Sequence, residues 1–382
     1  MVPTKAQEIN EYLQHGDISL AVRRMLDWSL ESNDSSLMEA SINWSNKLDS
    51  SIAGNDYSPS FIEEGYQLVQ KASALKEPPA FVSKPLVKAT AITKKYSSGN
   101  FSMKPVDVSL FSGKITGIVG ENGNGKTTLL RCLAGQLAID NGSIEYSLLH
   151  KPDYYDIKHH VAFIPQRIPR WYGRLKDNLH FSAAISGLKG QENERMVAFM
   201  LQRLGLGKYA GLSWEQISSG YRTRFELARI LLQKPQLLIL DEPLANLDIK
   251  AQQTVLTDLQ FLVKSARYPM GIILSSQQLH EVEKVADEVL FISNGQTKLN
   301  SKSSLQQEAA QNVIIEIETT ASRESIAQVL ADMQVNISFN GGCYNISSPT
   351  TDAAAMLAKL LEQHIPIVYF RDITHSAKRF FY

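Results

Sequence analysis

The sequence predicts an α/β domain with a mainly parallel sheet, between an N-terminal all-helical unit and a C-terminal α+β unit. Three observations lead to this prediction. Residues 1–80 show only the helical spacing of apolar residues, residues 86–302 alternate short apolar runs with helical stretches, and residues 310–382 follow the order βαββαβ. A length of 382 residues also suits two or three domains of about 150 residues each.

The composition indicates a globular chain. It holds 39 basic and 39 acidic residues, which give a formal net charge of zero, and 43% of its residues are hydrophobic. This apolar content is enough for packed cores. A neutral balance excludes the strong basic field on which non-specific nucleic-acid binding depends, so no nucleic acid is expected as a partner.

The two cysteines, Cys132 and Cys343, indicate a reducing, intracellular compartment. Two residues cannot form a disulfide framework in a chain of this length, and their spacing is not that of a metal site. The N-terminus MVPTKAQEIN lacks the basic-then-apolar pattern of a signal peptide, and no apolar run reaches about 18 residues. We therefore expect a chain that neither spans nor crosses a membrane.

The N-terminal unit contains two clear helical patterns. DISLAVRRMLDWSLES has apolar positions at helical spacing, with Asp17 placed to cap its start. SPSFIEEGYQLVQKASAL has Pro59 in a first-turn position, with Ser60 and Glu63 as a predicted capping box. The three prolines of KEPPAFVSKP disfavour helix and predict a linker near residues 77–85.

The central unit is predicted from its apolar runs, which are ITGIVG, VAFIPQ, LLILDEP, MGIILSS and VLFIS. Their alternation with longer helical stretches is typical of parallel sheets. The C-terminal unit reads as strand VIIEIET, helix RESIAQVLADM, strands VNISF and CYNIS around the turn Asn340-Gly341-Gly342, helix TDAAAMLAKLLEQ and strand IPIVYF. This order is the ferredoxin-like arrangement.

The most specific motif is GENGNGKTT, which follows an apolar strand and precedes a helical run. It satisfies the phosphate-loop pattern G-x-x-x-x-G-K-[ST] in the context that the pattern requires, which makes a chance glycine-rich turn the weaker interpretation. Backbone N–H groups curl around phosphate oxygens, the lysine reaches the β- and γ-phosphates, and the first threonine binds magnesium. The predicted ATP-binding residues are Gly120, Glu121, Asn122, Gly123, Asn124, Gly125, Lys126, Thr127 and Thr128.

A second apolar strand, LLILDEP, ends in Asp241 and Glu242. A carboxylate at the end of a buried strand is costly unless it meets a cation, so Asp241 suits magnesium binding. Glu242 would then lie next to the γ-phosphate, where a carboxylate can orient or deprotonate an attacking water. Acidic residues also simply end strands, so this motif alone is weak.

Together these motifs resemble the nucleotide-binding subunit of an ATP-binding cassette (ABC) transporter over most of residues 86–300. The phosphate loop and LLILDEP match the two Walker motifs of that family. FIPQR supplies Gln166 at the position of the Q-loop, whose side chain senses the γ-phosphate and magnesium, and LANLD matches the D-loop, ending in Asp248. The resemblance implies a P-loop NTPase of the ABC ATPase type, with ATP and Mg²⁺ as cofactors.

The family signature LSGGQ corresponds to ISSGYRTRFELARILL in this chain. Ser218 and Gly220 are kept, whereas Ser219 and Tyr221 replace a glycine and the glutamine. The resemblance implies that this segment lies far from its own phosphate loop and contacts the ATP held by a partner cassette, in trans. Two cassettes, identical or different, would then close head to tail around two nucleotides.

Two further positions follow from the resemblance. Tyr96, in ITKKYSSG, stands where the family places an aromatic residue that stacks on adenine, with Phe101 as the fallback and strand packing as the alternative. Gln277, in SSQQLHEVE, stands where the family has a switch histidine and is predicted as a catalytic residue beside Glu242. His280 lies one helical turn later and would point away from the phosphate.

Other candidate side chains are interpreted as ordinary surface, loop or core residues. The two histidines lack a neighbouring Cys or acidic cluster with ligand spacing, the charged residues suit solvated loops, and the tryptophans recur among apolar neighbours. These residues are His159, His160, Asp156, Lys158, Trp28 and Trp44.

The resemblance implies an ATP-hydrolysing subunit that powers a transporter through ATP-dependent cassette dimerisation. Its permease would be encoded separately and would contact RIPRWYGRLKDNLHFSAAISGL, after Gln166, holding the cassette at the cytoplasmic face of the membrane. The alternatives are a soluble ABC ATPase acting on the ribosome or DNA, and a regulatory ATPase. ABC ATPases that act in translation usually carry two cassettes in one chain, and those that act on chromosomes carry a long coiled-coil insertion between the Walker motifs. This sequence shows one cassette and no heptad insertion there. The sequence does not identify the cargo, its direction of transport, or the role of the two flanking units.

Overall fold

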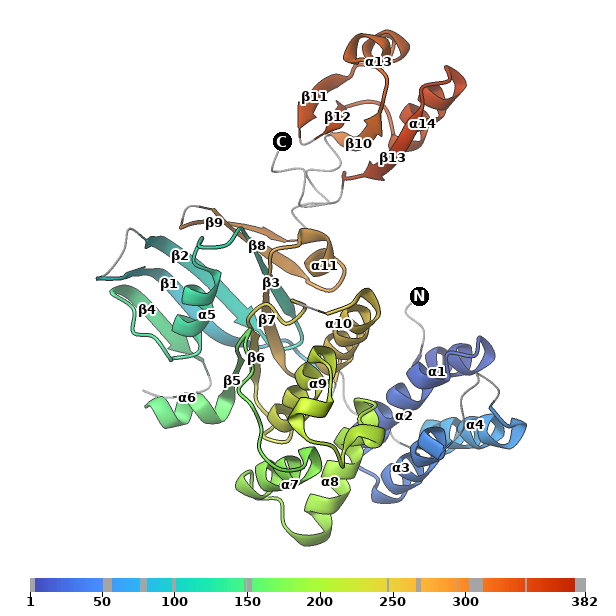
Figure 1. The fold of residues 1–382 in the computed structure, drawn as a ribbon, viewed down its shortest axis with the longest axis vertical. Coiled ribbons are helices and arrows are strands. Elements are labelled where there is room, and N and C mark those ends of the chain that lie inside the picture. The colour runs from blue at the N-terminus through green and yellow to red at the C-terminus, as the bar shows by residue number, and fades with distance from the viewer. Residues whose placement is uncertain are drawn as a thin grey trace. The chain divides into compact units, whose positions relative to one another are not determined.

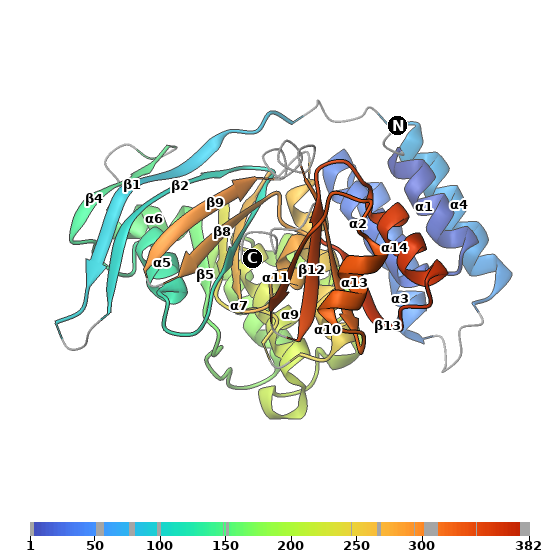
Figure 2. The ribbon, with the colours of Figure 1, turned by 90° about the horizontal axis from the view of Figure 1, so that it is seen from above.

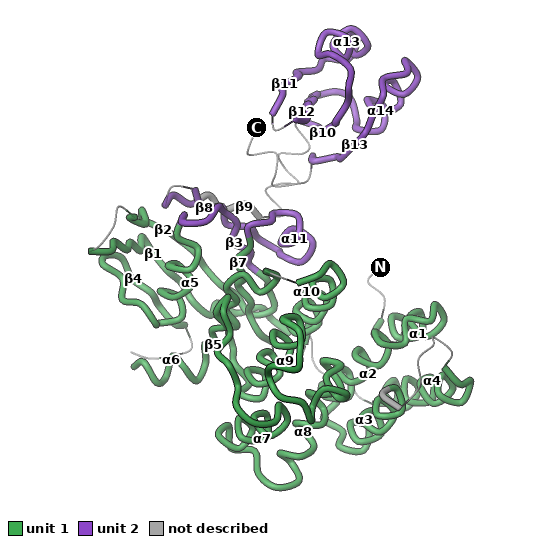
Figure 3. Tube along the Cα trace, in the orientation of Figure 1, with its two compact units in different colours: residues 1–115, 125–276 green, residues 116–124, 277–382 purple. Residues whose placement is uncertain are grey.

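The chain divides into two compact units in a computed structural model (Figures 1 and 3). The first comprises residues 1–115 and 125–276, and the second comprises residues 116–124 and 277–382. The domain boundaries predicted from the sequence stay predictions. The structure describes residues 4–50, 57–75, 81–97, 101–147, 149, 153–245, 247–265, 269–293, 295–301, 312–340 and 342–374.

The N-terminal part of the first unit folds into packed helices, as predicted (Figures 1 and 2). Trp44 is fully buried there, its ring stacks on that of Phe61 with centroids 5.0 Å apart, and its Nε1 donates to the Phe61 carbonyl oxygen at 2.9 Å. Trp28 is buried as well, so both tryptophans are core residues. The helices are α1 (Lys5–Gln14), α2 (Ile18–Ser32), α3 (Ser35–Ser50) and α4 (Pro59–Ser73).

Both predicted helix caps need correction. Asp17 occupies the N-cap of α2, but its side chain makes no capping hydrogen bond. The capping box at Ser60 and Glu63 is wrong, because α4 begins at Pro59 and is capped by Ser58, whose Oγ accepts from Phe61 N at 3.3 Å. Proline lacks an N–H and has a fixed φ that suits the first helical position, which places the cap one residue before it.

The rest of the first unit holds two sheets. Strands β5, β6 and β7 pair in parallel and in that order, with Leu237 of β6 opposite Val161 of β5 and Gly271 of β7. Strands β2, β1 and β4 form a separate antiparallel sheet that the sequence analysis did not predict (Figure 2). The elements are β1 (Pro85–Lys95), β2 (Ser102–Phe111), α5 (Lys126–Leu133), β4 (Asn141–Tyr146), α6 (Tyr154–His160), β5 (Val161–Ile164), α7 (Leu175–Ile185), α8 (Gly190–Arg203), η1 (Gly207–Tyr209), η2 (Trp214–Gln216), α9 (Ser219–Leu231), β6 (Leu237–Leu240), α10 (Ile249–Val263) and β7 (Gly271–Ser276).

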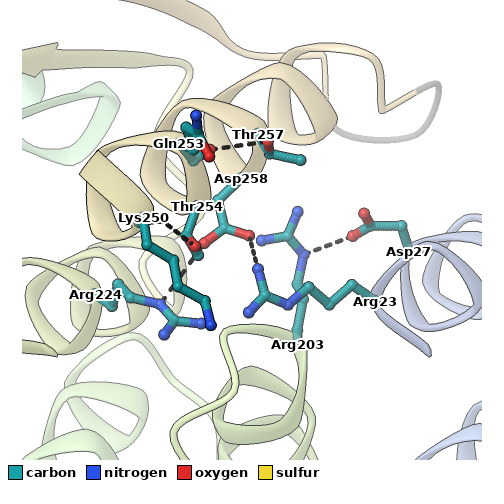
Figure 4. A network of polar contacts seen from close by, with 9 residues as sticks. All are labelled: Arg23, Asp27, Arg203, Arg224, Lys250, Gln253, Thr254, Thr257 and Asp258. Carbon is teal, nitrogen blue, oxygen red and sulfur yellow. Dashed lines mark hydrogen bonds and ion pairs between the residues drawn. The ribbon is translucent and has the colours of Figure 1, made fainter. Parts of the chain in front are cut away.

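Buried ion pairs connect α2 with α8 and α10, and a longer one connects α9 with α10 (Figure 4). Arg203 Nε donates to Asp27 Oδ1 at 2.5 Å, and Arg23 Nη1 donates to Asp258 Oδ1 at 3.1 Å. Arg224 Nε lies 3.8 Å from Asp258 Oδ2. Burial raises the pKa of Asp258 although the arginines oppose it, and burial lowers the pKa of Arg224 to about 10. The N-terminal helices are therefore tied to the rest of their unit by charges removed from water.

The second unit contains a parallel pair and a ferredoxin-like sheet. Strand β3 pairs in parallel with β8, Thr116 opposite Glu288, and β9 adds to β8 antiparallel. The C-terminal strands follow the order β11-β12-β10-β13, which confirms the predicted βαββαβ arrangement. The elements are β3 (Ile115–Val119, with residues from Thr116 in this unit), α11 (Leu279–Glu283), β8 (Glu288–Ser293), β9 (Gln296–Ser301), β10 (Val313–Thr319), α13 (Arg323–Val329), β11 (Asn336–Asn340), β12 (Cys343–Ser348), α14 (Ala353–Glu362) and β13 (Ile367–Asp372).

The predicted α/β fold is confirmed, because all five apolar runs of the central region form strands. Within the described ranges, no helix combines the length and apolar character needed to cross a bilayer.

The two cysteines differ in exposure, which predicts different reactivity. Cys132 is 1% exposed and burial raises the pKa of its thiol to about 11, whereas Cys343 is half-buried. Because the thiolate is the reactive form, we expect a thiol reagent at pH 8 to modify Cys343 and to spare Cys132 until the protein unfolds. Mass spectrometry of labelled peptides measures this. Rapid labelling of Cys132 in the Cys343→Ser variant would contradict the prediction.

Candidate nucleotide-binding site

The phosphate loop connects β3 to α5, as the motif requires. Gly120 fits only as glycine, since a Cβ there would lie 2.3 Å from the Ile292 carbonyl oxygen. Gly125 has a φ of +101°, and a Cβ there would lie 2.4 Å from Phe101 Cζ. Residues up to Asn124 belong to the second unit and residues from Gly125 to the first.

The start of α5 is suited to an anion. Its N-cap is Gly125, which offers no side-chain acceptor to the first N–H groups of the helix. The positive end of the helix dipole therefore adds to the charge of Lys126, the first residue of α5. Thr127 and Thr128 follow in the same turn, so three predicted site residues share the start of one helix.

A chain of hydrogen bonds holds the Asp241 carboxylate and the Glu242 backbone, which follow β6. Thr127 Oγ1 donates to Asp241 Oδ2 at 2.8 Å, and Ser275 Oγ donates to Asp241 Oδ1 at 2.8 Å. The same Ser275 oxygen accepts from Glu242 N at 2.9 Å. Ser275 is fully buried near the end of β7 and was not predicted. The sequence signal for Ser275 was a polar residue near the end of the apolar run MGIILSS. That run forms β7, which pairs with the strand before the two carboxylates.

Glu242 is held from two further directions. Its Oε1 lies 3.4 Å from Lys126 Nζ, and its Oε2 accepts from Gln166 Nε2 at 2.8 Å. Its backbone φ is +46°, which is uncommon for a residue with a side chain and costs about 1–3 kcal/mol. Strain of this kind persists only where the surroundings fix the residue. The structure thus brings Lys126, Thr127, Gln166, Asp241 and Glu242 together.

The chemistry of these donors fits magnesium. Thr127 and Asp241 present oxygen atoms 2.8 Å apart, and Gln166 has a carbonyl oxygen besides the amide nitrogen that contacts Glu242. Mg²⁺ prefers oxygen ligands and commonly takes one or two carboxylates together with substrate phosphates. Among the residues that the structure describes, no group of three or more His, Cys, Asp or Glu side chains could hold a metal. The Thr127 and Asp241 oxygens therefore suit a metal that takes its other ligands from phosphate and water.

Both aromatic candidates lie beside the start of α5. Tyr96 OH is 3.2 Å from Thr128 Oγ1, and Phe101 lies against Gly125. The two ring centroids are 6.3 Å apart. Their position suits a base bound next to the phosphate loop, and the choice of stacking residue stays a prediction.

The signature segment forms the beginning of α9. Ser218 is the N-cap and Ser219 the first helical residue, both exposed, whereas Gly220 is buried. Tyr221, which replaces the family glutamine, packs on Tyr209 with ring centroids 4.0 Å apart. The tyrosine thus contributes to packing within the chain, while both serines remain accessible.

Ser219 also lines a cavity of about 250 Å³ that contains Gln166 and Glu242 of the same chain. The resemblance instead implies that this segment contacts the nucleotide of a partner cassette.

The remaining candidate residues are a helix-capping aspartate, an exposed glutamine and exposed histidines. Asp248 caps α10, where its Oδ1 accepts from Ala251 N at 2.8 Å. Gln277 is exposed and directly follows β7, and it belongs to the second unit, so its catalytic role stays a prediction. His280 and His159 are exposed, as expected for surface residues.

Comparison with known proteins supports the resemblance to the nucleotide-binding subunit of an ABC transporter. Residues 103–245 match the family model described as ABC transporter. The chain is 32% identical over 197 residues to the uncharacterized ABC transporter ATP-binding protein YxlF of Bacillus subtilis, which covers 51% of this chain and 64% of that protein. It is 29% identical over 227 residues to the human ATP-binding cassette sub-family A member 9, covering 58% of this chain and 14% of that protein.

A solved structure shares the fold. It is cbiO1 from Clostridium perfringens, part of the ABC transporter complex cbiONQ, with a TM-score of 0.53 and 23% identity, covering 65% of this chain and 95% of that chain. The chain therefore spans less than two thirds of each of the two relatives above, and almost the whole of a solved cassette.

Proposed function

We propose that this chain, which carries an ATP-binding cassette of the ABC transporter family, binds and hydrolyses ATP to power a transporter. The observation that carries the proposal is the connected set of Lys126, Thr127, Asp241, Glu242 and Gln166 at the phosphate loop. Such a set places a cation, metal-ligand oxygens and a carboxylate base around one phosphoryl group.

Each side chain has a distinct role in this proposal. Lys126 would bind the β- and γ-phosphates, and Thr127, Gln166 and Asp241 would hold Mg²⁺, which supplies positive charge to the transferred phosphoryl group when it is bound. Glu242 accepts a proton from the attacking water, and its two neighbours, Lys126 and Gln166, orient its carboxylate.

Two cassettes would close around two ATP molecules in this function. The accessible side chains of Ser218 and Ser219 and the positive end of the α9 helix dipole are suited to the γ-phosphate of a partner-bound nucleotide. Because γ-phosphate contacts are lost on hydrolysis, the closed pair would reopen and deliver a mechanical stroke.

The segment after Gln166 would receive the permease. Tyr172 is 78% exposed, and Phe181 and Ile185, one turn apart on α7, are 69% and 70% exposed. Large apolar side chains grouped on an accessible surface mark interaction sites. Docking there would hold the cassette at the cytoplasmic face of the membrane. Co-purification with a polytopic membrane protein, lost in a Phe181→Glu variant that still hydrolyses ATP, tests this contact.

A complementation experiment tests the composite site. We expect Lys126→Ala and Ser218→Arg each to abolish hydrolysis, and a mixture of the two to recover about one quarter of the parental rate. Half of randomly mixed dimers combine both chains, and each such dimer has one site with an intact loop and an intact signature. A steady-state phosphate-release assay measures the rate.

The matched control mixes Lys126→Ala with Glu242→Gln. These two residues are neighbours within one chain, so every site in the mixed dimer keeps one defect and no rate should return. If the first mixture also stays inactive although size-exclusion chromatography shows mixed dimers, the signature acts in cis, as the cavity shared by Ser219 and Glu242 would allow.

A further inference from the structure

A single carboxylate joins three helices of the first unit. Asp258 lies on α10 and is 1% exposed. Its Oδ1 accepts from Arg23 Nη1 of α2 at 3.1 Å, and its Oδ2 lies 3.8 Å from Arg224 Nε of α9 (Figure 4). One buried negative charge therefore serves two arginines that approach it from different helices.

The two arginines are also close to each other. A Cβ at Gly205 would lie 3.0 Å from Arg224 Nη2 and 3.2 Å from Arg23 Nη2, so both guanidinium groups lie beside this glycine. The charge of Arg23 adds to burial in lowering the pKa of Arg224 to about 10. Because like charges at this range repel, the position of each arginine depends on its contact with Asp258.

Asp258 contacts the two arginines unequally. Arg23 is within hydrogen-bond distance, whereas Arg224 Nε and Asp258 Oδ2, at 3.8 Å, are not. Both of these atoms are buried and have no hydrogen-bond partner in the described structure. Since unpaired buried polar atoms are costly, a shift of about 1 Å that pairs the two would be favourable. The contact with Arg23 holds the carboxylate in its present place and opposes that shift.

We propose that Arg23 is a positioning residue for the signature segment, because it holds the carboxylate that faces α9. Arg224 lies on the same helix as Ser219, and Ser218 caps that helix, so a shift of Arg224 along with its helix displaces both serines. The inference rests on the proposed function, in which these serines contact a nucleotide. A displacement of about 1 Å can lower a reaction rate about 100-fold.

Replacing Arg23 with methionine tests the proposal, because the charge is lost and most of the side-chain length is kept. We expect the turnover number to fall by about tenfold or more, while affinity for a fluorescent ATP analogue stays parental because the phosphate loop is unchanged. Arg23→Lys should restore most of the turnover, since the contact uses one N–H donor that an ammonium group can replace. Phosphate release measures the turnover number.

Arg24→Met is the matched control, because Arg24 is the next residue on α2 and is also buried. Its Nε donates to Glu8 at 2.9 Å, and its guanidinium lies over the ring of Phe261, 5.1 Å from the centroid. Its loss should destabilise the N-terminal helices and leave the turnover number parental. Equal losses of turnover in Arg23→Met and Arg24→Met would assign the effect to helix stability and overturn the proposal.

A double-mutant cycle tests whether Arg23 acts through Asp258. Asp258→Asn keeps the shape of the side chain and removes its charge. On this background Arg23→Met should lower the turnover number no further, whereas independent effects would multiply. Multiplied losses would therefore overturn the proposal.

Hydrogen–deuterium exchange measures the same displacement without hydrolysis. Amide exchange in the peptide that contains Ser218 and Ser219 should change in Arg23→Met and stay parental in Arg24→Met. Unchanged exchange in a folded Arg23→Met variant would overturn the proposal. A parent that does not hydrolyse ATP would count against the proposed function, and exchange would still decide whether Arg23 positions the signature segment.

Discussion

Replacing Lys126 with alanine is expected to weaken ATP binding by more than about 100-fold. Each hydrogen bond to a charged partner contributes about 1.5–3 kcal/mol, and two such bonds to the β- and γ-phosphates account for the loss. The side chain is almost fully buried at the start of α5, where solvent does not replace it. Equilibrium titration with a fluorescent ATP analogue measures the affinity.

Lys104→Ala provides the control for Lys126→Ala. Lys104 is an exposed residue of β2 and has the same charge and length, so its loss tests whether any lysine contributes equally. Its ATP affinity should match the parental value. Parental affinity in a folded Lys126→Ala variant would show that the loop does not bind phosphate.

Replacing Glu242 with glutamine is expected to lower the turnover number by about 10²–10⁴-fold while ATP still binds. The amide keeps the shape of the side chain and can still accept from Gln166, but it cannot take a proton from water. ATP should then hold two cassettes together. Phosphate release measures turnover, and light scattering with size-exclusion chromatography measures the mass of the trapped dimer.

Glu194→Gln is the matched control, because the side chain of Glu194 is 77% exposed. This variant should hydrolyse ATP at the parental rate and remain in its parental oligomeric state. Hydrolysis at the parental rate in Glu242→Gln would instead assign the base to another residue.

Features that depend on neighbouring residues were predictable from the sequence. The five central strands and the phosphate loop each consist of consecutive residues whose pattern has one clear structural meaning. The position of the two carboxylates in LLILDEP was predictable because they directly follow an apolar run that forms a strand. Even so, the cap of α4 was assigned to Ser60 instead of Ser58, because the pattern alone did not weigh the position of Pro59.

Features that depend on contacts between residues far apart in the sequence were not predictable. Strands β1, β2 and β4 form their own sheet, but β4 is separated from β2 in the sequence by the phosphate loop, β3 and α5, so no local pattern pairs them. Ser275 bonds the Asp241 carboxylate and the Glu242 backbone N–H from another strand, and a serine in an apolar run has no pattern of its own. Arg23 meets Asp258 across 235 positions, a separation at which charge patterning gives no indication.

The ion pairs of α2 have a mechanical consequence. Helix α2 forms an ion pair with α8 through Asp27 and Arg203, and one with α10 through Arg23 and Asp258. If α8 turned relative to α10, α2 would have to follow both or release one. Releasing a buried pair costs about 3–5 kcal/mol, a substantial fraction of the stability of a typical domain. We therefore expect any rearrangement of α8 relative to α10 to carry α2 with it.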